Sequence, residues 1–171
     1  TEETYNHYCT SWAMAFNTPF KYWKRYSGYE GGIADPCIVS WPKGITARGE
    51  VRHQYTHAID IVPTLYELIG IEPPDEVKGV AQSRIEGTSF KYALEKADEP
   101  TRKQWQFYTM LGTRGIWANG WHANTVHPSV SGWRHFEKDE WELYHLDEDR
   151  NQTHNLAAQE SDKLEFMKDL W

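Results

Sequence analysis

Residues 17–36, NTPFKYWKRYSGYEGGIADP, lead into the short apolar run CIVSW at 37–41. Two cations, Lys24 and Arg25, stand shortly before a pair of glycines, Gly31 and Gly32. Basic side chains on a loop can bind an anion, and glycines let the backbone approach closely or take a positive φ where a side chain would clash. By spacing alone, a solvated basic face that includes Lys21 is the more common arrangement. Both interpretations are open at this point.

Composition excludes some classes of function. The chain has 171 residues and a net charge of −7. This charge argues against nucleic-acid binding, because a phosphate backbone requires a basic face. No apolar run approaches the roughly 18 residues of a membrane span. The chain begins without Met and stops inside a helical pattern, so we expect it to be part of a longer protein, whose compartment stays unknown.

The cysteines and the aromatic residues are less specific. Cys9 and Cys37 form neither a metal motif nor a disulfide framework, so we expect both to be unpaired. Aromatic residues make up 15% of the chain, with nine Trp. Such content usually belongs to a core rich in large rings, and binding of an aryl group or a sugar is the sharper interpretation.

The first part of the chain predicts an α/β unit. We expect mostly loop up to residue 36, then a buried strand over 37–41. A helix should begin at Asp60, which can cap its free amides, and end at Gly70. His57 is expected to pack near the start of this helix rather than to act in catalysis. A strand followed by a helix is an α/β signature.

The later part predicts a small antiparallel layer. Residues 105–111 and 141–146 alternate in part like strands, and Asn119-Gly120 suits a two-residue hairpin turn. Ser161 can cap a final helix. Three antiparallel strands and a terminal helix would form an α+β layer.

Several blocks of this chain, in order, resemble type I sulfatases, the arylsulfatase-like enzymes of the alkaline phosphatase superfamily. Each block alone is weak, but their order and spacing together are specific, and they cover nearly the whole chain. The blocks are 17–20, Lys24 with 30–33, 36–42, 57–65, 87–90, 114–117, 120–122, 141–144 and 155–157.

The resemblance implies the alkaline-phosphatase-like sulfatase fold, which is α/β with a large mixed sheet. Residues 1–100 would be the C-terminal portion of the catalytic domain and would contribute a late strand and helix. Residues 101–171 would form a C-terminal subdomain, in which a small antiparallel sheet packs on the terminal helix. The partner of both would be the preceding part of the same protein.

The resemblance also implies the hydrolysis of small-molecule sulfate esters. In the family, a Cys or Ser in a Cys/Ser-x-Pro/Ala-x-Arg motif becomes formylglycine, whose hydrated form attacks sulfur, while Asp and Asn side chains hold Ca²⁺. Neither Cys9 nor Cys37 has arginine at the fifth position of such a motif, and no Asp-Asn pair precedes Asn17. We therefore expect no metal ligand here, the formylglycine and the calcium ligands in the preceding part, and no activity from this piece alone.

The resemblance assigns the site residues as well. The family's sulfate-binding lysine usually stands about five residues before the acidic residue of the double-glycine turn. Lys24 stands six before Glu30 and Arg25 five, so Lys24 is the first choice and Arg25 the second. His122 and His127 flank a strand that approaches the substrate in related enzymes, so either could contact the organic part of the substrate.

Three other functions remain open from the sequence. A phosphonate or phosphodiester hydrolase of the same superfamily would use the same anion contacts. A non-catalytic, aromatic-rich module could bind glycans. A degenerate homologue could have lost its nucleophile and act as a partner protein.

Overall fold

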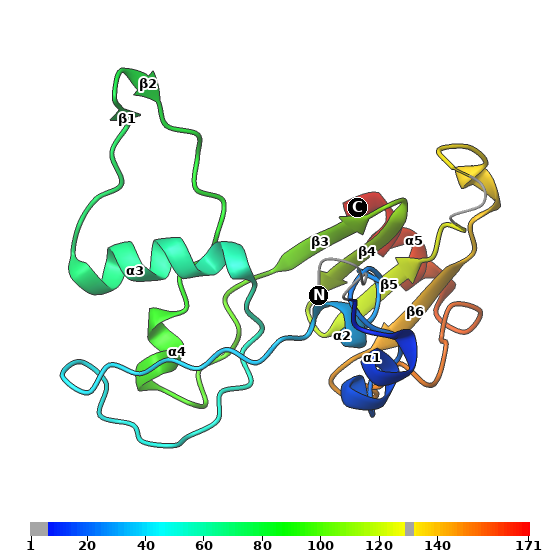
Figure 1. Cartoon of the computed structure of the whole chain (residues 1–171), viewed down its shortest axis with the longest axis horizontal. Coiled ribbons are helices and arrows are strands. Elements are labelled where there is room, and N and C mark those ends of the chain that lie inside the picture. Colours follow the sequence, from blue (N-terminus) through cyan, green and yellow to red (C-terminus); the bar gives the residue numbers. More distant parts are fainter. Residues whose placement is uncertain (1–6, 129–131) are drawn as a thin grey trace. The chain divides into compact units, whose positions relative to one another are not determined.

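The computed structural model describes residues 7–128 and 132–171 (Figure 1). The chain separates into two compact units. One joins the N-terminal residues through Pro36 to Trp105–Trp171, and the other is Cys37–Gln104. The expected boundary near residue 100 concerns the domains of a complete enzyme and stays a prediction.

The first unit is built on a four-stranded antiparallel sheet in the order β3-β4-β5-β6, one strand more than expected. The predicted hairpin joins β4 to β5, and its turn residues Asn119 and Gly120 have φ of 48° and 82°. A type I′ turn needs positive φ at both positions, so the Asn-Gly signal is confirmed. The strands are β3 (Trp105–Met110), β4 (Thr113–Ala118), β5 (Trp121–Thr125) and β6 (Trp141–His145).

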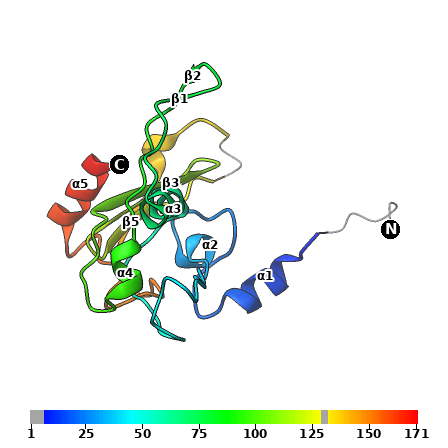
Figure 2. The same ribbon diagram turned by 90° about the vertical axis from the view of Figure 1, so that its left-hand side faces the viewer.

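One face of this sheet is apolar and is covered by the terminal helix α5 (Ser161–Leu170). Met167 of α5 is fully buried in the core, which also contains Ile116, Ala118, Ala123 and Leu143. The helix was predicted in the right place, but its N-cap is Glu160, and Ser161 is its first helical residue. Figure 2 shows α5 on one side of the sheet and α2 (Glu30–Ile33) on the other.

The opposite face of the sheet is polar. His122 pairs across the strands with Tyr144, and Asn124 pairs with Glu142. Side chains alternate along a strand, so these four lie on the same face. The turn at 27–30 crosses this face closely, because a Cβ atom on Gly28 would lie 2.6 Å from Cβ of Asn124. β4 and β5 are therefore covered on both faces, on one by a helix and on the other by a turn of the N-terminal segment, whereas the edge strand β3 is largely exposed.

The N-terminal segment holds two helices where mostly loop was expected. α1 (Thr10–Asn17) buries none of its residues, and α2 contains both glycines of the double-glycine turn. A Cβ on Gly31 would lie 2.2 Å from the carbonyl oxygen of Lys21, and one on Gly32 would lie 2.2 Å from that of Tyr26. The expected close approach of the backbone at these glycines is confirmed, and its physical reason is the packing of α2 against the preceding loop.

The second unit contains the predicted helix, α3 (Ile61–Ile69), which ends at Gly70 with φ of 68°. The predicted strand over 37–41 is wrong: this segment joins no sheet, and Ile38 is 91% exposed. A strand needs a hydrogen-bonding neighbour, and the described residues of this unit supply none to it. The other elements are η1 (Ala58–Asp60), β1 (Glu76–Val77), β2 (Val80–Ala81) and α4 (Lys91–Glu95), while η3 (Phe136–Lys138) belongs to the first unit.

The start of α3 differs in detail from the prediction. Asp60 stands at the N-cap position of α3, as predicted, but its side chain makes no capping bond to α3. Its Oδ2 instead accepts a hydrogen bond from the backbone N–H of His57 at 2.8 Å, which closes a capping box around η1. His57 packs at the helix start, as expected. Asp60 Oδ1 accepts bonds from Thr88 N and from Lys103 Nζ, each at 2.8 Å. Asp60 and Lys103 form a buried ion pair, with side chains 1% and 6% exposed.

The buried ion pair predicts a large effect of Asp60→Ala. The substitution leaves the Lys103 ammonium buried without its partner, so the free energy of unfolding should fall by about 3–5 kcal/mol. Urea denaturation of the complete protein checks this as a lower midpoint of the transition to which this unit contributes. Glu95→Ala, at an exposed position of α4, is the control and should leave the midpoint in place. Equal midpoints for the two variants would contradict the prediction.

The buried His122 predicts a pH dependence of stability. Burial lowers the pKa of His122 to about 4 from the ordinary 6.5. Between these values the unfolded chain binds a proton that the folded chain does not, so stability is lost as the pH falls from 6.5 to 4, by up to about 3 kcal/mol. Unfolding of His122→Gln across this range should show a shallower loss than the native protein. His154→Gln, at an exposed position, should retain the native slope, and the same slope in His122→Gln would refute the assignment.

Candidate functional site

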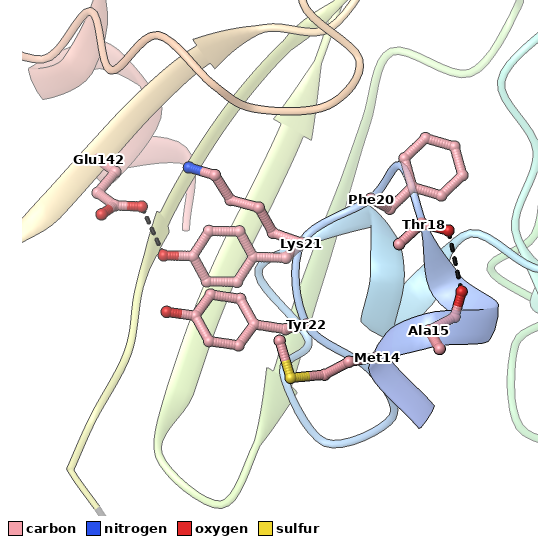
Figure 3. Close-up of a pocket in the computed structure, with 8 residues that line it drawn as sticks. Met14, Ala15, Thr18, Phe20, Lys21, Tyr22 and Glu142 are labelled. Atoms are coloured by element: carbon pink, nitrogen blue, oxygen red, sulfur yellow. Dashed lines mark hydrogen bonds between the residues drawn. The ribbon is translucent and has the colours of Figure 1, made fainter. Parts of the chain in front are cut away.

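The first unit contains a cavity of about 520 Å³ between α1, the following loop and the polar face of the sheet (Figure 3). This volume lies in the range of small-molecule sites in proteins. The cavity is lined by Met14, Ala15, Thr18, Phe20, Lys21, Tyr22, Tyr29 and Glu142.

Two phenols and one carboxylate form the polar side of this cavity. Glu142 Oε2 accepts hydrogen bonds from the hydroxyls of Tyr29 and Tyr144, at 2.6 and 2.8 Å. Burial, and then the interaction with Glu142, raise the pKa of both tyrosines well above the ordinary value. Both phenols are therefore protonated donors at neutral pH, and they hold the carboxylate in one orientation.

Lys21 is the basic residue that lines this cavity. Its Nζ lies 3.5 Å from the hydroxyl of Tyr144, and 5.2 and 5.9 Å from the ring centroids of Tyr144 and Tyr29. Contacts of this kind stabilise an ammonium group over a ring face. Sequence reasoning grouped Lys21 with a solvated basic face, because nothing in the spacing tells which of three nearby cations points inward.

Lys24 and Arg25 are both exposed, and neither is among the described residues that line the cavity. Arg25 has a φ of 103°, a value that residues other than glycine rarely adopt. An exposed side chain is free to contact another part of a complete enzyme. The role of Lys24 in sulfate binding, with Arg25 as second choice, therefore stays a prediction.

A second cavity, of about 480 Å³, shares Tyr22, Tyr29 and Glu142 with the first. Beside it, Asp139 bonds to Arg114 Nη2 at 2.9 Å and to His127 Nδ1 at 2.9 Å, while His127 Nε2 lies 2.8 Å from the carbonyl oxygen of Gly132. The remaining lining residues are Val126, Pro128, His135, Lys138, Asp139 and Glu140.

The two predicted substrate-contacting histidines are both buried. His127 is 4% exposed and His122 is fully buried. Among the described residues, neither ring nitrogen of His122 has a hydrogen-bond partner. The structure places the two rings in different surroundings, His122 under the turn at 27–30 and His127 beside Asp139. Their contact with the organic part of a substrate stays a prediction.

The described residues offer no obvious metal centre. Within 7–128 and 132–171, no group of three or more His, Cys, Asp or Glu side chains could hold a metal ion. Cys9 and Cys37 are both free, as predicted, and both are exposed. In the same part of the chain, no helix is long and apolar enough to span a membrane.

The family model described as N-sulphoglucosamine sulphohydrolase, C-terminal, matches residues 20–171. A sulfatase of Formosa agariphila is 26% identical over 149 residues, which are 84% of this chain and 26% of that protein. The N-acetylgalactosamine-6-sulfatase of Sus scrofa is 40% identical over 60 residues, which are 35% of this chain and 11% of that protein. The chain thus spans about a quarter of the length of the Formosa agariphila sulfatase.

Solved structures show the same fold. One solved structure superposes with a TM-score of 0.62 at 21% identity, over 85% of this chain and 30% of that chain. Its description concerns the metabolism of multiple glycosaminoglycans by Bacteroides thetaiotaomicron. Another, solved in complex with its substrate D-glucosamine-2-N,6-O-disulfate, has a TM-score of 0.53 at 22% identity, over 78% and 26%. These matches confirm the sulfatase fold, to which this chain contributes the small antiparallel sheet and helices. Because the family model covers residues 20–171, the chain belongs to the sulfatase family, as a C-terminal part of one of its members.

Proposed function

We propose that the complete protein is a sulfuric ester hydrolase, similar to arylsulfatases, and that this chain forms part of its substrate site. The observation that carries the proposal is the family match over residues 20–171. The cavity beside the double-glycine turn supports it, because it combines the ammonium group of Lys21 with the hydrogen-bonding groups of Tyr29 and Glu142. Relatives are named for sulfated amino sugars, so we propose sulfated sugars as the substrate class.

Calcium and formylglycine belong to this proposal, but not to this chain's described residues. A bound calcium ion would polarise the sulfate as a Lewis acid. No described group of side chains fits the ion, and neither cysteine carries the arginine of the formylglycine motif. We therefore assign both to the preceding part of the protein, and expect the 171 residues alone to be inactive.

The role proposed for Lys24 is to bind the sulfate and to stabilise charge on the leaving oxygen as the ester bond breaks. Its exposed ammonium group is available to a neighbouring part of the enzyme. Arg25 is the alternative, one residue nearer to the double-glycine turn. A positive group in this position would act on any tetrahedral anion, so a phosphonate or phosphodiester hydrolase is the nearest alternative function.

The proposal predicts a large loss of activity in Lys24→Ala. In the complete protein, kcat/KM for 4-nitrophenyl sulfate should fall about 100-fold, the cost of losing one charge-stabilising contact in a transition state. Lys43→Ala removes an exposed lysine of the other compact unit and should leave kcat/KM at the native value.

Two outcomes would change this assignment. Native activity in Lys24→Ala, together with a loss in Arg25→Ala, would transfer the role to Arg25. Faster turnover of bis(4-nitrophenyl) phosphate than of the sulfate ester by the native protein would favour the phosphodiester alternative.

A further inference from the structure

We infer that the cavity lined by Lys21, Tyr22 and Glu142 binds a neutral saccharide ring adjacent to the sulfated unit of the substrate. This inference rests on the proposed function, and it assigns the cavity to a part of the substrate other than the sulfate. Lys21 and Glu142 would determine the preference for an oligosaccharide over a small ester.

Glu142 supplies the acceptor of this subsite. The hydrogen bonds that it receives from described residues both end on Oε2, one from Tyr29 and one from Tyr144. A carboxylate has two oxygens and about four acceptor positions. Oε1 can therefore accept hydrogen bonds from hydroxyl groups of a ligand, and the two phenols orient it before the ligand binds. Such prior orientation lowers the entropic cost of binding.

Lys21 supplies the donor. An ammonium group has three N–H bonds and accepts none, and the Tyr144 hydroxyl at 3.5 Å can engage one of them. The rings of Tyr29 and Tyr144 hold the group from the protein side. Figure 3 shows the amine of Lys21 and the carboxylate of Glu142 on the same side of the cavity. The remaining donors can therefore reach ether and hydroxyl oxygens of the same ring that Glu142 binds.

The charges of the subsite favour a neutral ligand. One cation and one anion line the cavity, so its formal charge is zero. A second sulfate or a carboxylate would approach Glu142 unfavourably, and an ammonium group would approach Lys21 unfavourably. Sugar hydroxyls both donate and accept, so a neutral ring satisfies the two charged side chains together.

The apolar side of the cavity matches the other half of a sugar ring. Tyr22 is 38% exposed; its ring is stacked on Tyr26 with the centroids 4.4 Å apart, and it is tilted against Tyr29 at 4.7 Å between centroids. In Figure 3, Met14 lies beside Tyr22, and Phe20 lies on the side away from Glu142. A pyranose has a C–H face and a rim of hydroxyls, so its C–H face can pack on the apolar lining of Met14 and Phe20 while its rim meets the polar groups.

The test compares two substrates in the complete protein. One is a disaccharide of sulfated glucosamine linked to an unsulfated hexose, and the other is 4-nitrophenyl sulfate. In Lys21→Gln and Glu142→Gln, the ratio of kcat/KM for the disaccharide to that for the small ester should fall about tenfold, as expected for the loss of a hydrogen bond to a charged group. Lys43→Gln is the matched control and should keep the native ratio.

A titration separates this inference from the proposed function. Calorimetry with the corresponding unsulfated disaccharide should show binding to the native protein and about tenfold weaker binding to both variants. If both variants hydrolyse 4-nitrophenyl sulfate and keep the native ratio of kcat/KM for the disaccharide to that for the small ester, the subsite is overturned and the sulfatase assignment is kept. Absence of all hydrolysis, with binding that the variants weaken, would overturn the sulfatase and keep the subsite. No binding of the unsulfated disaccharide to the native protein would also overturn the subsite.

Discussion

The site depends on one side-chain amide. Gln152 is fully buried; its Oε1 accepts a hydrogen bond from the backbone N–H of Glu30 at 2.8 Å, and its Nε2 donates to the carbonyl oxygen of Gly28 at 3.1 Å. These two bonds join segments more than 120 residues apart in sequence. They hold the turn at 27–30 against the polar face of the sheet, because a buried backbone N–H and C=O that lost this partner would remain unsatisfied. Tyr29, which lies between the two bonded residues, is thereby placed within reach of Glu142.

The same arrangement explains why the sheet has two different faces. α5 covers the apolar face with Met167, as in any amphipathic helix on a sheet. The polar face is covered instead by a glycine-containing turn, which fits because Gly28 has no Cβ to meet Asn124. Buried polar groups on a sheet are costly unless they are paired; on this face Glu142 is paired with Tyr29 and Tyr144, whereas His122 has no hydrogen-bond partner among the described residues.

The basic residues of the N-terminal segment lie in two different environments. Lys21 is held by aromatic rings inside a cavity of the chain itself, whereas Lys24 and Arg25 extend from the surface of the same loop. Under the proposed function, Lys24 would contact the sulfate, and Lys21 would contact the part of the substrate that carries it.

Local chemistry was enough to predict the elements with short-range causes. The Asn119-Gly120 hairpin, the end of α3 at Gly70 and the alternation of β6 depend on residues close in sequence, and the order of sulfatase-like blocks indicated the family. The tertiary structure alone decided which lysine points inward, since the partners of Lys21 include Tyr144, 123 residues away. It also decided that 37–41 joins no sheet and that Asp60 pairs with Lys103, because a strand neighbour and a buried counter-ion come from distant parts of the chain. Residue type and spacing fix local geometry, whereas the distances between remote side chains exist only once the chain has folded.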